Sequence, residues 1–291
     1  MNPPRHPDLP RDASGHLRAG LRIVASVLVY RLVRLEMANL VAAASLVIAL
    51  RLSAADALVR VVFAFVLNVL AYTINDYVDR DLDQKEGRAP EKTRFLIAHA
   101  REALWAQLVL AAVLVAIALA HDPFLLVSGA LGAGLCWVYT ARWKASPGAD
   151  VLAMTAWGAA MPLCAVPLDR PMGFVLIGQL ALFSMCFEIL QVMRDRESDA
   201  AIGVRTTAVA LGAEGSERLL RGAVVLAGVY AALFVHVTLS PLVLLAALVP
   251  TRRRTERAWH MVRFIFGLAW LGMLTAVYLT GTLEGWVGPA R

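Results

Sequence analysis

Two short segments of this sequence carry carboxylates at helical spacing. In residues 75–83, Asp76, Asp79 and Asp83 follow the spacing i, i+3, i+7, which places all three side chains on one face of a helix. Asp81 falls on another face, where we expect a solvated or arginine-paired charge. In residues 188–199, Glu188, Gln191, Asp195 and Asp199 form a similar stripe, with Glu197 off it.

Like charges stacked along a helix repel, so both stripes need compensation. Hard divalent cations supply it, because Mg²⁺ favours carboxylate oxygens and completes its shell with water and phosphate oxygens. Two acidic walls facing each other would therefore suit a diphosphate held by bridging metal ions. The phosphate charge that remains could be neutralised by basic residues nearby. These are Lys85, Arg88, Lys92, Arg94 and Arg205.

The alternative for either stripe alone is a solvated helix end or a local ion-pair network. The joint occurrence of the two stripes favours a site, provided that both helices end at the same face of the molecule. Whether they do depends on the elements that carry them.

Those elements are membrane-spanning helices. The chain has 291 residues, of which 59% are hydrophobic and only 17% charged, whereas soluble domains carry about 25% charged residues. Apolar stretches long enough to cross a bilayer recur along the whole chain. We expect an all-α polytopic bundle of about nine helices, at residues 24–50, 55–79, 103–120, 123–140, 150–168, 173–194, 219–236, 239–251 and 261–283.

The basic residues predict the orientation of this bundle. With a cytoplasmic N-terminus and nine spans, all but Arg51, Arg60, Arg170 and Arg291 of the 28 Lys and Arg residues lie on the inner side. This is the positive-inside pattern. The pattern accounts for the net charge of +6 as a topology signal. We therefore do not expect nucleic acid as a partner. Both acidic stripes end outward-to-inward helices and should meet at the cytoplasmic face. We interpret residues 1–20 as a disordered cytoplasmic leader and 21–291 as one transmembrane domain.

These motifs resemble those of the UbiA superfamily of intramembrane prenyltransferases. NDYVDRDLD (75–83) is similar to the family motif NDxxDxxxD, and DRESD (195–199) with the following AAIGVRTTAV is similar to the second motif, DxxxD. Tyr139 and Lys144 resemble its Tyr-x-x-x-x-Lys element, and Arg34 and Asn39 resemble polar positions of its first helix. The resemblance covers nearly the whole chain.

The resemblance implies a Mg²⁺-dependent enzyme that ionises an allylic isoprenyl diphosphate and transfers the prenyl group to a small aromatic or lipophilic acceptor. It implies metal binding by Asp76, Asp79, Asp83, Asp195 and Asp199. It implies catalytic roles for Asp76, Asp195 and Lys144, with Asp195 taking the proton that an aromatic acceptor releases. The implied substrate-binding residues are Asn39, Asn75, Lys85, Arg88, Arg94, Tyr139, Glu188, Gln191 and Arg205. We expect a bacterial inner (cytoplasmic) membrane location, with the site facing the cytoplasm.

The sequence departs from the family pattern where an acceptor would bind. The loop after the first motif reads Arg94-Phe95-Leu96-Ile97-Ala98-His99, where family members often have Arg-Pro-Leu followed by a small residue and Gly. Glu188 and Gln191 stand where Asp and Tyr are more usual. A terpene cyclase that needs no external acceptor therefore stays open. A cation transporter is a more distant alternative, because transporters usually place broken helices near mid-membrane.

Overall fold

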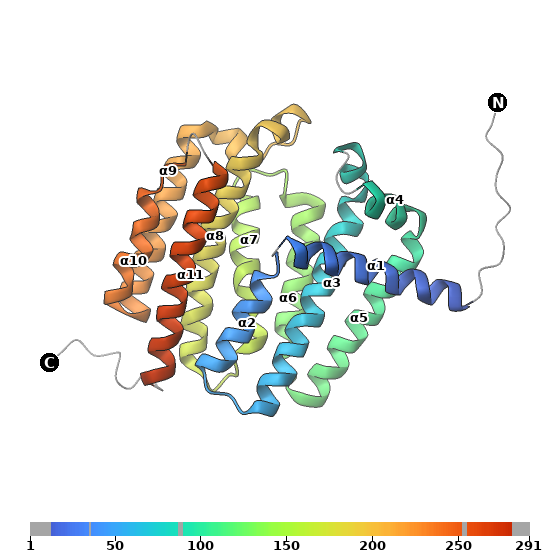
Figure 1. Cartoon of the computed structure of the whole chain (residues 1–291), viewed down its shortest axis with the longest axis horizontal. Helices are drawn as coiled ribbons and strands as arrows, with labels where there is room; N and C mark the ends of the chain where they lie inside the picture. The colour runs from blue at the N-terminus through green and yellow to red at the C-terminus, as the bar shows by residue number, and fades with distance from the viewer. Residues whose placement is uncertain (1–12, 35, 87–89, 252–254, 281–291) are drawn as a thin grey trace.

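The computed structural model describes residues 13–34, 36–86, 90–251 and 255–280, and every element in this part of the chain is helical. Figure 1 shows most helices running roughly parallel, in chain order around the bundle. The long helices are α3 (Ala54–Glu86), α5 (Ala100–His121), α6 (Leu125–Val138), α8 (Pro171–Ala201), α9 (Thr207–Tyr230) and α11 (Thr255–Thr280). π-helical turns extend α6 over Tyr139–Trp143 and α9 over Ala231–Val235.

These six helices, with their extensions, are long and apolar enough to cross a membrane. Two shorter apolar segments complete the bundle. One contains α7 (Ala149–Ala160) and a 3₁₀ turn at Pro162–Ala165; the other contains α10 (Ser240–Leu244) between 3₁₀ turns at Val237–Leu239 and Leu245–Leu248. The prediction of an all-helical polytopic membrane bundle is confirmed. Only 17% of the apolar window of α5 is buried, as expected for a helix that faces lipid.

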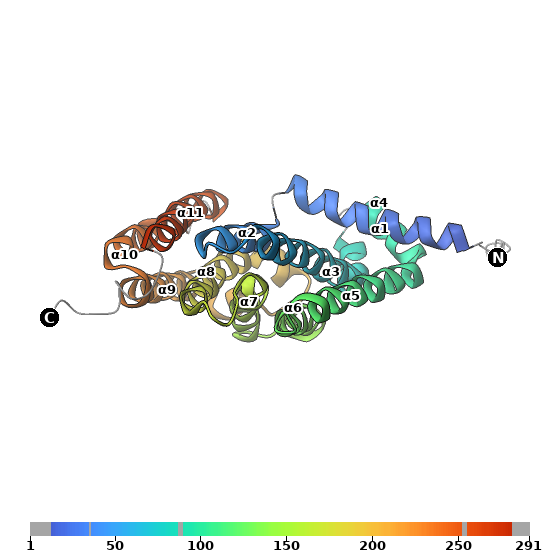
Figure 2. The same ribbon diagram turned by 90° about the horizontal axis from the view of Figure 1, so that it is seen from below.

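The first predicted span is not one helix. Residues 24–50 divide into the end of α1 (Ala13–Val33) and all of α2 (Ala38–Ala49), and the chain turns sharply between them. Figure 1 shows α1 running across α3 and α5 rather than alongside them, and Figure 2 shows it covering them on one side. Charged residues explain the break, because Arg31 and Arg34 both pair with Glu36 at 2.6 Å. These charges could not enter a hydrocarbon layer cheaply in a continuous span.

The remaining differences concern surface segments. The predicted loop around Arg94–His99 is largely α4 (Pro90–Ala98), a helix that begins at a proline, which the first turn of a helix tolerates. Helix α1 includes Ala13–Gly20, the last part of the segment expected to be a leader, while residues 1–12 lie outside the described residues. Helix α9 starts earlier than its predicted span and is kinked at Gly212, whose φ is +68°.

Candidate active site

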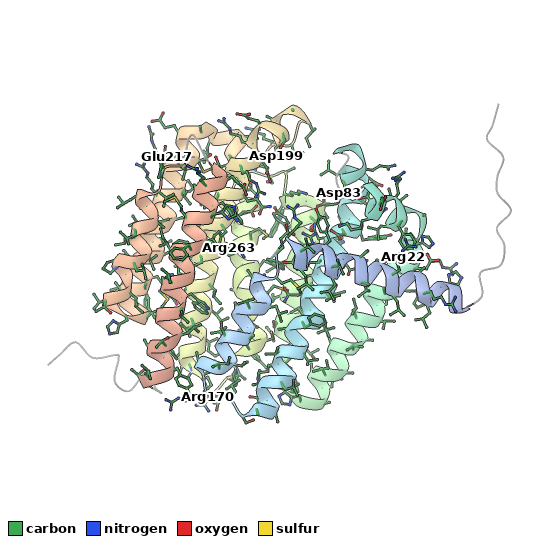
Figure 3. All side chains as sticks on the ribbon, viewed as in Figure 1. Arg22, Asp83, Arg170, Asp199, Glu217 and Arg263 are labelled. Carbon is green, nitrogen blue, oxygen red and sulfur yellow. The ribbon has the colours of Figure 1, made fainter. Side chains whose placement is uncertain are left out.

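The two acidic stripes end at the same end of the bundle. Figure 3 shows Asp83, at the end of α3, and Asp199, at the end of α8, on one side of the molecule, with Arg170 at the opposite end. The condition that the sequence left open is therefore met. Asp81 is 73% exposed beside Arg80, as predicted, and Glu197, the off-face residue of the second segment, is 92% exposed beside Arg196.

The first stripe is neutralised by cations from three other elements. Asp76 is buried and pairs with Arg31 of α1 through Oδ1 and with Lys92 of α4 through Oδ2, both at 2.7 Å. Asp79 pairs through Oδ2 with Lys144, just after α6, at 2.8 Å. Asp83, one turn further along, is half-buried. Neighbouring negative charges are tolerated here because Asp76 and Asp79 each have a cation within contact distance.

Asn75 links the members of this cluster. Its amide Nδ2 donates to Asp79 Oδ2 at 3.0 Å and to the hydroxyl of Thr140 at 3.3 Å, and its Oδ1 accepts from Arg31 at 3.3 Å. The side chain thereby holds the carboxylate of Asp79 at a fixed angle to α6. The sequence-predicted residues Asn75, Asp76, Asp79 and Lys144 are brought together by the fold.

The second stripe runs from the buried interior to the surface of α8. Glu188 is buried and accepts a hydrogen bond from Tyr139 Oη at 3.0 Å, which joins α8 to the turn after α6. Asp195, nearer the surface, pairs with Arg194 at 3.0 Å. Asp199 lies in the last turn of α8. The stripe thus offers one buried, hydrogen-bonded carboxyl and two accessible ones.

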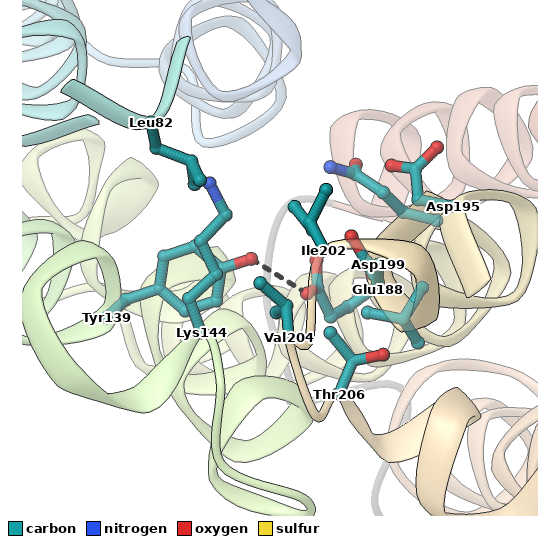
Figure 4. Close-up of a pocket in the computed structure, with 11 residues that line it drawn as sticks. Leu82, Tyr139, Lys144, Glu188, Asp195, Asp199, Ile202, Val204 and Thr206 are labelled. Atoms are coloured by element: carbon teal, nitrogen blue, oxygen red, sulfur yellow. Dashed lines mark hydrogen bonds between the residues drawn. The ribbon is translucent and has the colours of Figure 1, made fainter. Parts of the chain in front are cut away.

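One pocket lies between the two stripes (Figure 4). It contains about 510 Å³ of space, part of it open to solvent. The lining residues are Leu82, Tyr139, Lys144, Glu188, Gln191, Val192, Asp195, Asp199, Ile202, Val204 and Thr206. The second stripe contributes all four of its members, whereas α3 contributes Leu82. Of the first stripe, Asp79 is connected to this pocket through Lys144, which lines it and pairs with Asp79.

Other predicted residues lie at varying distances from this centre. Asn39 is half-buried in the first turn of α2. Arg94 on α4 and Arg205, between two pocket-lining residues, are both exposed. Arg34 is exposed and pairs with Glu36. The side chains of Lys85 and Arg88 lie outside the described residues, so their predicted role stays a prediction.

Sequence reasoning missed two groups that build the site. Arg31 is the first: it contacts Asp76 although it lies 45 residues away in the chain. The signal was an arginine inside an apolar stretch, which is rare without a partner. The second is Asp150, a fully buried carboxylate at the start of α7 that accepts hydrogen bonds from the backbone N–H of Thr207 at 2.7 Å and from the Thr207 hydroxyl. This contact fixes the loop that carries Val204 and Thr206.

The carboxylates around the pocket fit one mode of magnesium binding, in which the substrate completes the coordination shell. Within the described ranges, no three His, Cys, Asp or Glu side chains converge closely enough to hold a metal ion by themselves. Mg²⁺ is usually bound by one or two carboxylates together with substrate phosphates rather than by a complete protein cage. Asp79 on one side and Asp195 and Asp199 on the other meet that requirement, with Lys144 between them.

Fold and site together define a polytopic membrane protein with an acidic, partly open pocket at one end of its bundle. The chain belongs to the UbiA prenyltransferase family, whose model matches residues 37–263, and it is accordingly a prenyltransferase family enzyme. The resemblance noted in the sequence is thereby confirmed.

Curated relatives agree with this assignment. The chain is 29% identical over 252 residues to a 4-hydroxybenzoate octaprenyltransferase of Alkalilimnicola ehrlichii, covering 76% of this chain and 84% of that one. It is 28% identical to the 4-hydroxybenzoate octaprenyltransferase of Neisseria meningitidis serogroup B over about half of each chain, 51% in both cases.

Solved structures share the fold at low sequence identity. A structure described as digeranylgeranylglyceryl phosphate synthase aligns with a TM-score of 0.72 and 14% identity, covering 91% of this chain and 99% of that one. A UbiA homolog from Archaeoglobus fulgidus, determined bound to DMAPP and Mg²⁺, aligns with a TM-score of 0.64 and 18% identity over 90% and 99% of the two chains.

Proposed function

We propose that this chain catalyses the Mg²⁺-dependent transfer of a prenyl group from an allylic isoprenyl diphosphate to a small aromatic or lipophilic acceptor. One observation carries the proposal: the pocket between the acidic stripes is lined by Lys144, Asp195 and Asp199, and Lys144 also pairs with Asp79. The pocket is thereby bordered by carboxylates of the second motif and by a cation, Lys144, that contacts the first motif at Asp79.

The diphosphate of the donor would lie in this pocket. When bound, Mg²⁺ would supply positive charge that stabilises the diphosphate as a leaving group. Asp76, Asp79 and Asp83 on one wall and Asp195 and Asp199 on the other would hold the metal ions. Lys144 adds a fixed cation to which phosphate oxygens can bond. Asn75 keeps Asp79 oriented throughout, since its amide donates to that carboxylate.

The reaction breaks the allylic C–O bond, and its electron pair leaves with the diphosphate. The resulting allylic cation forms a C–C bond with an electron-rich carbon of the acceptor, which then loses a proton. Asp195 is our candidate for the proton acceptor, because it lines the pocket and is partly exposed. Its neighbour Arg194 pairs with it at 3.0 Å.

The acceptor would meet the wall formed by Tyr139, Glu188 and Gln191. This wall presents a hydroxyl, a carboxyl and an amide side by side, a set that suits a small molecule with hydroxyl or carboxyl groups. The name shared by the curated relatives, 4-hydroxybenzoate octaprenyltransferase, supports a phenolic acceptor. We place the pocket on the cytoplasmic side of a bacterial inner membrane, following the distribution of Lys and Arg.

The test uses purified protein in nanodiscs with geranyl, farnesyl and geranylgeranyl diphosphates, with and without 4-hydroxybenzoate, and with Mg²⁺ present or chelated. Pyrophosphate release and organic products are both followed. Asp76→Asn and Asp195→Asn should each lower the rate by about 100-fold or more, since each removes charge at the reacting centre. Asp81→Asn and Glu197→Gln, on the same helices but off the stripes, should leave it unchanged.

The products decide between the alternatives. A prenylated acceptor supports the transferase, whereas a cyclic hydrocarbon formed without acceptor would replace it with a terpene cyclase. No Mg²⁺-dependent pyrophosphate release from any donor, even with a panel of phenols present, would overturn the proposal.

A further inference from the structure

Asp76 has both carboxylate oxygens occupied by cations of this chain. Its Oδ1 lies 2.7 Å from a terminal nitrogen of Arg31, and its Oδ2 lies 2.7 Å from Nζ of Lys92. The residue is only 3% exposed. A metal ion that binds Asp76 therefore competes with these cations for its carboxylate oxygens.

The displaced cations would have few other partners. Arg31 is 15% exposed; it bonds to Glu36 at 2.6 Å and to Asn75 Oδ1 at 3.3 Å, and its buried Nε has no hydrogen-bond partner. Lys92 is 13% exposed and lies over the ring of Tyr30 at 4.2 Å. A buried cation deprived of its carboxylate is costly. Metal binding to Asp76 alone thus takes the carboxylate of Asp76 from Lys92 and leaves Arg31 with Glu36 as its carboxylate partner.

A diphosphate removes this cost because it brings several negative oxygens. Arg31, with an unused donor at Nε, is suited to phosphate oxygens by its planar array of N–H groups, and Lys92 by its compact charge. The two cations come from different elements, α1 and α4, that contact each other and pack against α3. Both can therefore respond to the same ligand.

We propose that Arg31 and Lys92 occupy Asp76 in place of the metal and move to the diphosphate when donor and metal bind together. This inference rests on the proposed function. Its consequence is coupled binding: metal alone binds weakly, diphosphate alone meets the acidic walls, and each increases the affinity for the other. The site would thereby avoid filling with metal ions when no donor is present.

The experiment measures Mn²⁺ binding by electron paramagnetic resonance on the purified protein, with and without inorganic pyrophosphate. In the unaltered protein, pyrophosphate should tighten Mn²⁺ binding by about fivefold or more, a typical coupling between sites. In Arg31→Gln, Mn²⁺ alone should bind several-fold more tightly and the effect of pyrophosphate should shrink. Lys92→Gln, a change on α4 rather than α1, should likewise tighten the binding of Mn²⁺ alone and reduce the effect of pyrophosphate.

Arg18→Gln is the matched control, because Arg18 is an exposed arginine of the same helix and lies about three and a half turns from Arg31. It should behave as the unaltered protein does, and thermal unfolding checks that every variant is folded. If Arg31→Gln and Lys92→Gln leave Mn²⁺ binding unchanged or weaken it, the exchange is overturned while the metal site stands. If the unaltered protein binds no Mn²⁺ even with pyrophosphate, the metal site and the exchange fall together.

Discussion

At the scale of single residues, the site depends on pairs that each neutralise or orient one group. Lys144 with Asp79 and Tyr139 with Glu188 are two such pairs at the pocket. Each joins the turn after α6 to a carboxylate on another helix. The π-helical turn at Tyr139–Trp143 makes this possible, because it changes the direction in which Tyr139 and Lys144 project.

The hydroxyl of Tyr139 can be tested by removing it alone. Tyr139→Phe leaves the buried Glu188 without its hydrogen-bond donor, a change that costs about 1–3 kcal/mol. We expect kcat/KM for the acceptor to fall about tenfold or more, with a smaller effect on the KM of the donor. Steady-state kinetics with each substrate varied in turn give both values.

Tyr230→Phe serves as the comparison. Its hydroxyl donates to the backbone oxygen of Val175 at 3.0 Å, away from the pocket, so both KM values should stay unchanged. Equal losses for donor and acceptor in Tyr139→Phe would argue against an acceptor-binding wall.

At the scale of elements, two buried polar contacts hold helices in register at opposite ends of the bundle. Near the pocket, Asp150 of α7 binds the first residue of α9, and Thr207 Oγ1 in turn accepts from the backbone N–H of Gly148 at 2.7 Å. At the other end, Arg60 of α3 pairs with Asp56 and with Asp122, which follows α5. The first contact bears on function and the second on stability.

The Asp150 contact should position the loop that follows the second motif. Asp150→Asn exchanges a charged acceptor for a neutral one, and Thr207→Val removes the hydroxyl that it binds. We expect each to raise the KM of the donor several-fold and to lower stability by about 1–3 kcal/mol. The double variant should lose less than the sum, since both changes break one contact.

Thermal unfolding and donor kinetics on all four proteins of this cycle supply the test. Additive losses would mean that the two residues act separately and that the loop is held by other contacts.

The Arg60 contact should matter for stability and not for metal dependence. Arg60 is 4% exposed, bonds to Asp56 at 2.8 Å, to Asp122 at 2.7 Å and to the backbone oxygen of Cys164 at 3.0 Å. Arg60→Gln leaves Asp122 without its buried cation and Asp56 with His121 as its partner, and should destabilise the protein by about 1–3 kcal/mol. The measurement is the unfolding midpoint in detergent, together with the Mg²⁺ concentration for half-maximal activity, which should not move. A shifted Mg²⁺ requirement would show that this end of the bundle communicates with the site.

At the scale of the whole molecule, the ends of the bundle differ in chemistry. Asp83 and Asp199 lie at one end and Arg170 at the other (Figure 3). The positive-inside pattern predicts that the acidic site and most basic residues lie on the cytoplasmic side. The three native cysteines, Cys136, Cys164 and Cys186, are buried, so a cysteine introduced at the surface can be labelled selectively.

Orientation can be measured with such cysteines. Arg170→Cys should react with a membrane-impermeant maleimide in intact cells, and Arg218→Cys should react only after permeabilisation, because both side chains are accessible but at opposite ends. The reverse pattern would place the pocket outside the cytoplasm and contradict the orientation that we propose.

The sequence predicted what depends on local periodicity and composition. Apolar stretches of spanning length define a membrane protein in any fold, and the i, i+3, i+7 spacing puts Asp76, Asp79 and Asp83 on one face of any helix. The break between α1 and α2 was missed, because the apolar pattern continues through it. The charges at Arg31, Arg34 and Glu36 were the sign of it.

Only the tertiary structure decided which groups meet. Arg31, Lys92 and Lys144 reach the first motif across 45, 16 and 65 residues of chain, and Asp150 reaches Thr207 across 57. No local rule links positions so far apart, since their contacts depend on how helices pack and where they bend. The sequence by itself determined the carboxylates and the membrane that surrounds them. The packing of α1, α4 and the turn after α6 determined which cations neutralise those carboxylates, and hence which groups a bound metal ion would compete with.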